Sequence, residues 1–154
     1  MKVSRRHGRL RLRLEPVEVS LLQSLLDELT TVLEDDDTAD AVTQRLFPTA
    51  YPDDDTAEAD YRSITESGLR EERLQRVGAC AAELAVGADL DLSDEDDGRR
   101  WIQVLNDLRL ALGTRIGITE DEPDFDPTDP DAQPRHIYYW LTNVQDSVVT
   151  ALMR

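Results

Sequence analysis

Hydrophobic side chains recur every three or four residues over most of the chain, which is the spacing of an amphipathic helix. The first stretch begins at Pro16, a residue that suits the first turn of a helix, and ends near Glu34, where a run of acids opposes the helix dipole. The same spacing predicts further helices over 38–47, from Thr56 to a break or bend at Gly68, over 69–86, from the capping segment 93–96 to Ile116, and over 135–153.

Residues 9–14 follow a different pattern, because leucine and arginine alternate strictly there. A period of two is typical of a half-buried strand. The dipeptide His7-Gly8 lies where a tight turn would return from residues 2–4, so we expect a β-hairpin. A single hairpin is marginally stable in water. Its leucine face must therefore pack on the helices or pair with a second copy of the chain.

These patterns predict a mainly α fold, a bundle of five to six helices with a short N-terminal β-hairpin. The length of 154 residues fits one domain. Residues 1–14 would form a basic hairpin arm, and residues 119–134, with seven acids and four prolines, would form an acidic loop.

Charge divides the chain into two unequal parts. The first fourteen residues carry six basic side chains and no acidic one, whereas residues 15–154 have a net charge of −22, within a total of −16. The arm is therefore expected to dock on its own domain, on a sister subunit or on an external polyanion. The acidic remainder makes general nucleic-acid binding unlikely on electrostatic grounds, because phosphate contacts need positive charge. The sequence has no apolar run long enough to cross a bilayer and no apolar leader segment, so we expect a cytoplasmic protein without membrane contact.

The residues give little support for catalysis. Cys80 is the single cysteine and lies on an apolar helical face, where a thiol usually acts as a small hydrophobic group. The acidic clusters 34–37, 53–55, 94–97 and 120–126 lack the spaced ligands and central glycine of a calcium loop. We therefore predict no enzyme, no catalytic or metal-binding residue and no cofactor.

Seven residues are candidates for binding a partner. The basic arm contributes three arginines, the fifth helix contributes two arginines, and the start of the last helix contributes two aromatics that one neighbouring helix cannot bury together with Tyr138. The alternative for the helical arginines is an ion pair with one of the many carboxylates. Aromatic and arginine side chains are enriched at interfaces. The candidates are Arg9, Arg11, Arg13, Arg109, Arg115, Tyr139 and Trp140.

Three segments, 9–18, 45–51 and 105–119, resemble in this order the actinobacterial family called domain of unknown function 2017. The most specific is Leu105 to Thr119, with the sequence LNDLRLALGTRIGIT. The resemblance implies no enzymatic activity, and the family is similar to a group that includes a proposed oxidative-stress transcriptional regulator. A redox switch in that group relies on paired cysteines. With Cys80 alone, this chain would need an intermolecular disulfide or a small-thiol adduct.

The sequence thus favours a non-enzymatic regulatory or adaptor protein that acts through protein contacts in stress-response transcription. The expected partner is a protein, with a basic surface of a transcription factor as one candidate and a second copy of the chain as another. One alternative is a transcriptional regulator that contacts DNA with its basic arm. The other is a metal-dependent hydrolase that uses the acidic clusters.

Overall fold

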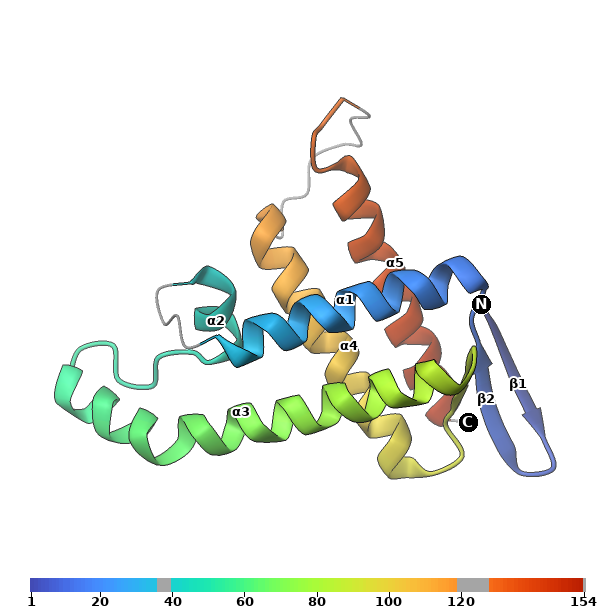
Figure 1. Ribbon diagram of the computed structural model, residues 1–154, viewed down its shortest axis with the longest axis horizontal. Coiled ribbons are helices and arrows are strands. Elements are labelled where there is room, and N and C mark those ends of the chain that lie inside the picture. The colour runs from blue at the N-terminus through green and yellow to red at the C-terminus, as the bar shows by residue number, and fades with distance from the viewer. Residues whose placement is uncertain (36–39, 119–127, 154) are drawn as a thin grey trace.

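The computed structural model describes residues 1–35, 40–118 and 128–153 of the chain (Figure 1). Within these ranges the predicted fold class is confirmed, since a short sheet accompanies five helices. The elements in chain order are β1 (Lys2–Arg6), β2 (Arg9–Arg13), α1 (Pro16–Glu34), α2 (Ala41–Leu46), α3 (Asp55–Val86), β3 (Asp89–Asp91), α4 (Glu95–Ile116) and α5 (Ala132–Leu152).

The helices form two crossing layers. Helices α1 and α3 run side by side in opposite directions, and the antiparallel pair α4 and α5 crosses behind them (Figure 1). Helix α2 packs on α4, and the sheet lies at one end of the bundle. Leucine and valine side chains fill the space between the layers together with Trp101, which is fully buried. None of the described helices is both long and apolar enough to span a bilayer.

Helix α1 covers the predicted residues and shows why they are helical. Pro16 stands in its first turn, and Leu22, Leu26, Leu29 and Leu33 form its buried stripe. The carboxylate of Glu18 accepts a hydrogen bond of 2.9 Å from the backbone N–H of Glu15, which completes a capping box. Local chemistry and burial therefore favour the same helix.

The predicted break at Gly68 is wrong, because α3 continues through it from Asp55 to Val86 as a single helix of 32 residues. A glycine inside a helix costs only about 1 kcal/mol relative to alanine. Ion pairs spaced four residues apart support the helix on both sides of it, through the series Glu58, Arg62, Glu66 and Arg70. Arg70 also donates hydrogen bonds to the backbone carbonyls of Leu33 and Asp35 at the end of α1.

The N-terminal hairpin is confirmed, and a third strand extends it. His7 and Gly8 have φ angles of 52° and 76°, the two positive values that a two-residue type I′ turn requires. Strand β3 pairs antiparallel with β2 on the side away from β1. Strand β3 was not predicted, although residues 89–92 alternate aspartate and leucine just as β2 alternates arginine and leucine. The leucine face packs on the helices, as predicted, with Leu10, Leu12, Leu14, Leu90 and Leu92 buried.

The remaining helix boundaries differ from prediction by a few residues. Thr38 and Ala39, expected at the start of the second helix, lie outside the described residues, and Asp40 caps α2 instead. Helix α4 starts after Asp94, and Gly117 follows it in the left-handed conformation with a φ of 70°. Helix α5 begins at Ala132, so residues 132–134 belong to it and not to the acidic loop predicted over 119–134, of which 119–127 are not described.

Candidate functional site

The outer face of the sheet gathers the positive charges of the N-terminal arm. Side chains alternate between the two faces of a strand, and the residues between the buried leucines of β2 are arginines. The register places Lys2 opposite Arg13, Ser4 opposite Arg11 and Arg6 opposite Arg9. We call the resulting surface the cationic face; it consists of Lys2, Arg6, Arg9, Arg11 and Arg13.

Part of the cationic face is paired with the chain's own acids. The Nε of Arg13 lies 2.7 Å from Oδ1 of Asp89, and Nη1 of Arg11 lies 3.8 Å from Oδ2 of the same carboxylate. The hydrogen bond from Arg13 holds the pKa of Asp89 below its ordinary value. The expectation that arginines of the arm lie against acids of the body is therefore confirmed for Arg11 and Arg13. Because the side chain of Arg13 is 70% exposed and that of Arg11 is 41% exposed, each ion pair contributes little to stability.

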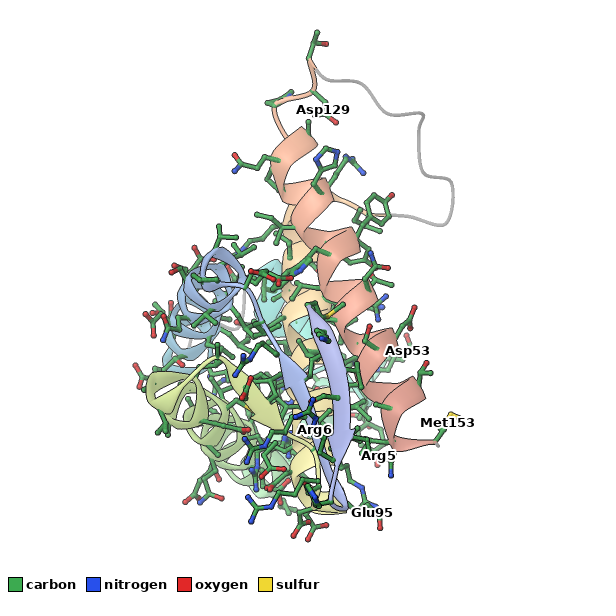
Figure 2. The ribbon with its side chains drawn as sticks, turned by 90° about the vertical axis from the view of Figure 1, so that its right-hand side faces the viewer. Arg5, Arg6, Asp53, Glu95, Asp129 and Met153 are labelled. Atoms are coloured by element: carbon green, nitrogen blue, oxygen red, sulfur yellow. The ribbon has the colours of Figure 1, made fainter. Side chains whose placement is uncertain are left out.

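Two cations of the edge strand β1, Lys2 and Arg6, face solvent on the outer side of the sheet. Within the described residues, Lys2 and Arg6 form no ion pair, and both side chains are exposed. Figure 2 shows Arg6 on the hairpin, which faces the viewer, with the C-terminal half of α5 beside it. The outer face of the sheet thus runs from acids on β3, through partly paired arginines on β2, to cations without an ion-pair partner on β1.

The candidate Arg109 lies between α4 and α5, far from the sheet. Its Nε and Nη1 donate hydrogen bonds to Thr142 at 3.1 Å and to Gln145 at 2.6 Å, and its guanidinium lies 5.4 Å from the ring centre of Tyr138. All three partners belong to α5. Arg109 therefore links α4 to α5 within one chain through polar contacts.

The three other helical candidates are spread over different surfaces. Arg115 forms an exposed ion pair of 3.3 Å with Glu28 of α1. Tyr139 is 44% exposed and packs edge-to-face against Tyr138. The indole of Trp140 packs against the core, and its Nε1 donates a hydrogen bond of 2.6 Å to Oε2 of Glu18. The structure therefore brings Arg9, Arg11 and Arg13 together but not the four helical candidates.

Cys80 lies in the core, as its position on an apolar face predicted. Its side chain is fully buried, and burial together with the charge of nearby Glu83 raises the pKa of the thiol to about 12. Glu83 accepts hydrogen bonds from the Trp101 indole at 2.8 Å and from the Asp91 backbone N–H at 2.7 Å. The thiol therefore stays protonated at neutral pH and is shielded by the contacts that join α3, α4 and β3.

A buried ionic cluster between α3 and α4 was not anticipated from the sequence. Asp107 is only 6% exposed, and Oδ1 of its carboxylate lies 3.5 Å from Nη1 of Arg73. Burial raises the pKa of Asp107, while the charges of Arg73 and Arg76 oppose that shift. Phe47 lies against this cluster, with its ring centre 5.0 Å from the guanidinium of Arg73. In the sequence, Arg70 and Arg73 are three residues apart, a spacing that places both arginines on the same side of α3.

The described residues contain no group of three or more His, Cys, Asp or Glu side chains that could hold a metal ion. Of the acidic clusters, 53–55 and 94–97 supply the residues Asp54 and Asp94, which cap α3 and α4. Parts of the clusters 34–37 and 120–126 lie outside the described residues. The cationic face is therefore the candidate site that the geometry defines best.

Comparisons with known proteins agree on one family. The sequence model described as "Domain of unknown function (DUF2017)" matches residues 1–152. The protein named "Oxidative stress regulator AosR" of Mycobacterium tuberculosis (strain ATCC 25618 / H37Rv) is 29% identical over 189 aligned positions, which cover 99% of this chain and 86% of the relative. The "Putative oxidative stress regulator AosR" of Mycobacterium leprae is 34% identical over 129 positions, which cover 74% of this chain and 59% of the relative. No significant match was found among the solved structures.

Proposed function

Because this chain belongs to the DUF2017 family and is similar to mycobacterial proteins named as oxidative stress regulators, we propose that it is a non-enzymatic regulator of the oxidative stress response that acts through protein contacts. The observation that carries the proposal is the cationic face. It presents Lys2 and Arg6 to solvent, whereas residues 15–154, which follow the arm, have a net charge of −22. Such a separation of charge favours recognition by electrostatic complementarity.

The acidic body adds a second element of recognition. Its field would speed encounter with a basic surface of another protein, for which a transcription factor is the candidate. Cys80 is the single cysteine and is fully buried, so the chain cannot respond to an oxidant by forming a disulfide within itself. Under this proposal the oxidant changes the partner, and the protein transmits the change through contact.

Contact with DNA is the second candidate function, and the same cationic face favours it. Five cations could neutralise several phosphates, and binding would then weaken steeply as salt increases. The net charge of the body repels the same duplex, which ranks this candidate second.

The proposal is tested in a strain that lacks the gene, by following transcript levels after treatment with hydrogen peroxide. Wild-type protein should restore the response, whereas Arg6→Glu should not. Arg45→Glu is the matched control, because Arg45 is exposed on α2 and its reversal changes the net charge by the same amount. Transcripts that do not depend on the gene, or that both variants restore equally, would contradict the proposal.

A further inference from the structure

Strand β1 is an edge strand whose outer side faces a groove and not another strand. The sheet has the order β1-β2-β3, so only β2 pairs with β1. An open groove of about 710 Å³ lies between this edge and the C-terminal half of α5. Met1, Val3, Arg5 and Leu10 line it from the arm, and Asn143, Asp146, Ser147, Thr150 and Ala151 line it from α5.

The hairpin register fixes which backbone groups point into this groove. In a two-residue hairpin the residues that flank the turn, here Arg6 and Arg9, form a hydrogen-bonded pair, and such pairs alternate with non-hydrogen-bonded ones. Val3 and Arg5 therefore occupy non-hydrogen-bonded positions, opposite Leu12 and Leu10. The hydrogen bond of 2.8 Å from Leu92 N–H to Leu10 C=O fits this alternation, because it directs Leu10 toward β3. The backbone N–H and C=O groups of Val3 and Arg5 consequently point away from β2, toward the groove.

We propose that an acidic, extended segment of a partner protein adds to β1 as a fourth strand and fills the groove between β1 and α5. Main-chain hydrogen bonds to a free sheet edge are a recurrent way of binding peptides, with alternate side chains giving specificity. This inference deepens the proposed function and rests on it for the role of the contact, but the binding itself is measurable without it.

The two sides of the added strand would meet different chemistry. On the outer side, its side chains would lie beside Lys2 and Arg6, which have no ion pair within the described residues. On the inner side, its side chains would meet the apolar surfaces of Val3 and Leu10, while Asp146 on the groove wall would repel an acid. The Arg5 side chain also lies on this side, where it donates a hydrogen bond of 3.2 Å to the backbone carbonyl of Ala151. The structure therefore favours a segment in which acidic residues alternate with apolar ones. Asp89, Leu90 and Asp91 have that pattern on the opposite edge of the sheet, where β3 pairs with β2.

Charge also argues against a second copy of the chain as the occupant. Antiparallel pairing of two β1 strands about Ser4 would place Lys2 of each copy opposite Arg6 of the other. Like charges directly opposite each other destabilise a sheet. The exposed edge, which would otherwise be a risk for self-association, is protected from its own copies by the same cations that would attract an acidic strand.

Binding is tested with the full chain and a short fluorescent peptide that alternates aspartate and valine, by anisotropy. We expect saturable binding that weakens with salt. A peptide with the same composition but with its acids and valines in separate blocks, and one with asparagine for aspartate, should each bind at least about tenfold more weakly. Peptides N-methylated on one alternate set of residues should lose binding, while those methylated on the other set should keep it, because only one set donates to β1.

Variants of the protein complete the test. Val3→Pro removes an outward N–H without removing a hydrogen bond of the hairpin, a change that edge strands tolerate, and should lower affinity about tenfold. Val3→Thr keeps the N–H and is the matched control. Arg6→Glu should weaken binding at low salt, and Arg45→Glu should not. Folding of each variant is checked by circular dichroism.

Several results would overturn the inference. Equal binding of the alternating and the blocked peptide would show attraction by charge without strand addition, and full binding by Val3→Pro together with both N-methylated peptides would show the same. Self-association of the chain that Val3→Pro abolishes would identify a second copy as the occupant. Tighter binding of a DNA duplex than of the peptide, unaffected by Val3→Pro, would assign the face to nucleic acid. If the peptide does not bind but the transcript response still depends on Arg6, this inference fails and the proposed function stands.

Discussion

Nε1 of Trp140 donates a hydrogen bond of 2.6 Å to Oε2 of Glu18, across 122 positions of the sequence. The same carboxylate accepts the backbone N–H of Glu15 and closes the capping box of α1. One side chain therefore both caps the first long helix and ties it to the last.

Removing this link should destabilise the whole domain. We expect Trp140→Phe, which keeps an aromatic ring but loses the donor, to lower the free energy of unfolding by about 1.5–3 kcal/mol, the range for hydrogen bonds to charged groups. Tyr51→Phe is the matched control, because Tyr51 is 48% exposed. The measurement is urea denaturation followed by circular dichroism. Equal midpoints for Trp140→Phe and the wild type would contradict this role.

The stability that Glu18 contributes should depend on pH. Burial opposes ionisation of Glu18, but the hydrogen bonds from Glu15 and Trp140, together with the ammonium group of Met1 at 3.1 Å, outweigh it and hold the pKa below its ordinary value of 4.5. A lowered pKa in the folded state means that the contribution is complete above 4.5 and is lost as the pH falls through the folded-state pKa. The difference in unfolding free energy between wild type and Glu18→Gln should therefore be constant near neutral pH and shrink in acid. A difference that grows as the pH falls would have the wrong sign.

Cys80 should behave as a structural residue. Its thiol is fully buried with a pKa of about 12, so a thiolate is not available at neutral pH. We expect a thiol reagent to label the native protein far more slowly than the unfolded one. Cys80→Ser should lose about 1–3 kcal/mol by burying a hydroxyl without a partner, and Cys80→Ala should separate the loss of volume from that of polarity. Labelling of the native protein as fast as free cysteine would overturn this interpretation.

Two glycines in helices should respond oppositely to alanine. A Cβ at Gly68 would meet no atom within 4 Å, so Gly68→Ala should stabilise α3 by about 0.5–1 kcal/mol. At Gly98 of α4 a Cβ would lie 2.6 Å from Cδ1 of Leu152, so Gly98→Ala must displace that side chain of α5. Thermal melts of the two variants test the difference. If Gly68→Ala lowered the melting temperature, the continuous helix through residue 68 would be contradicted.

Local patterns in the sequence were sufficient for much of this fold. The period of α1 and the turn at His7-Gly8 each depend on a few neighbouring residues and were predicted correctly. The break at Gly68 was wrong because ion pairs and contacts of Arg70 with α1 outweigh the cost of one glycine. Strand β3 was missed because three residues give too short a pattern to recognise without the neighbouring strand.

Some residues of the candidate site could likewise be grouped from local sequence patterns, and others could not. The cationic face follows from alternation in one segment, so Arg9, Arg11 and Arg13 could be grouped from the sequence alone. Arg109 and Trp140 find their partners, Gln145 and Glu18, only when the helices pack. The groove beside β1 depends on the distance between a strand and a helix at opposite ends of the chain, which no local pattern contains.

The proposed contact between the cationic face and a partner protein is tested most directly by photo-crosslinking in living cells. A benzophenone amino acid is placed at Ser4, which lies opposite Arg11 on that face, and in a control at Ile64, which is 79% exposed on α3. We expect a discrete protein adduct from position 4 that changes on oxidant treatment. This adduct should disappear in the Arg6→Glu variant and be absent from position 64. Adducts with nucleic acid, or none from position 4 in treated and untreated cells, would contradict the proposed contact.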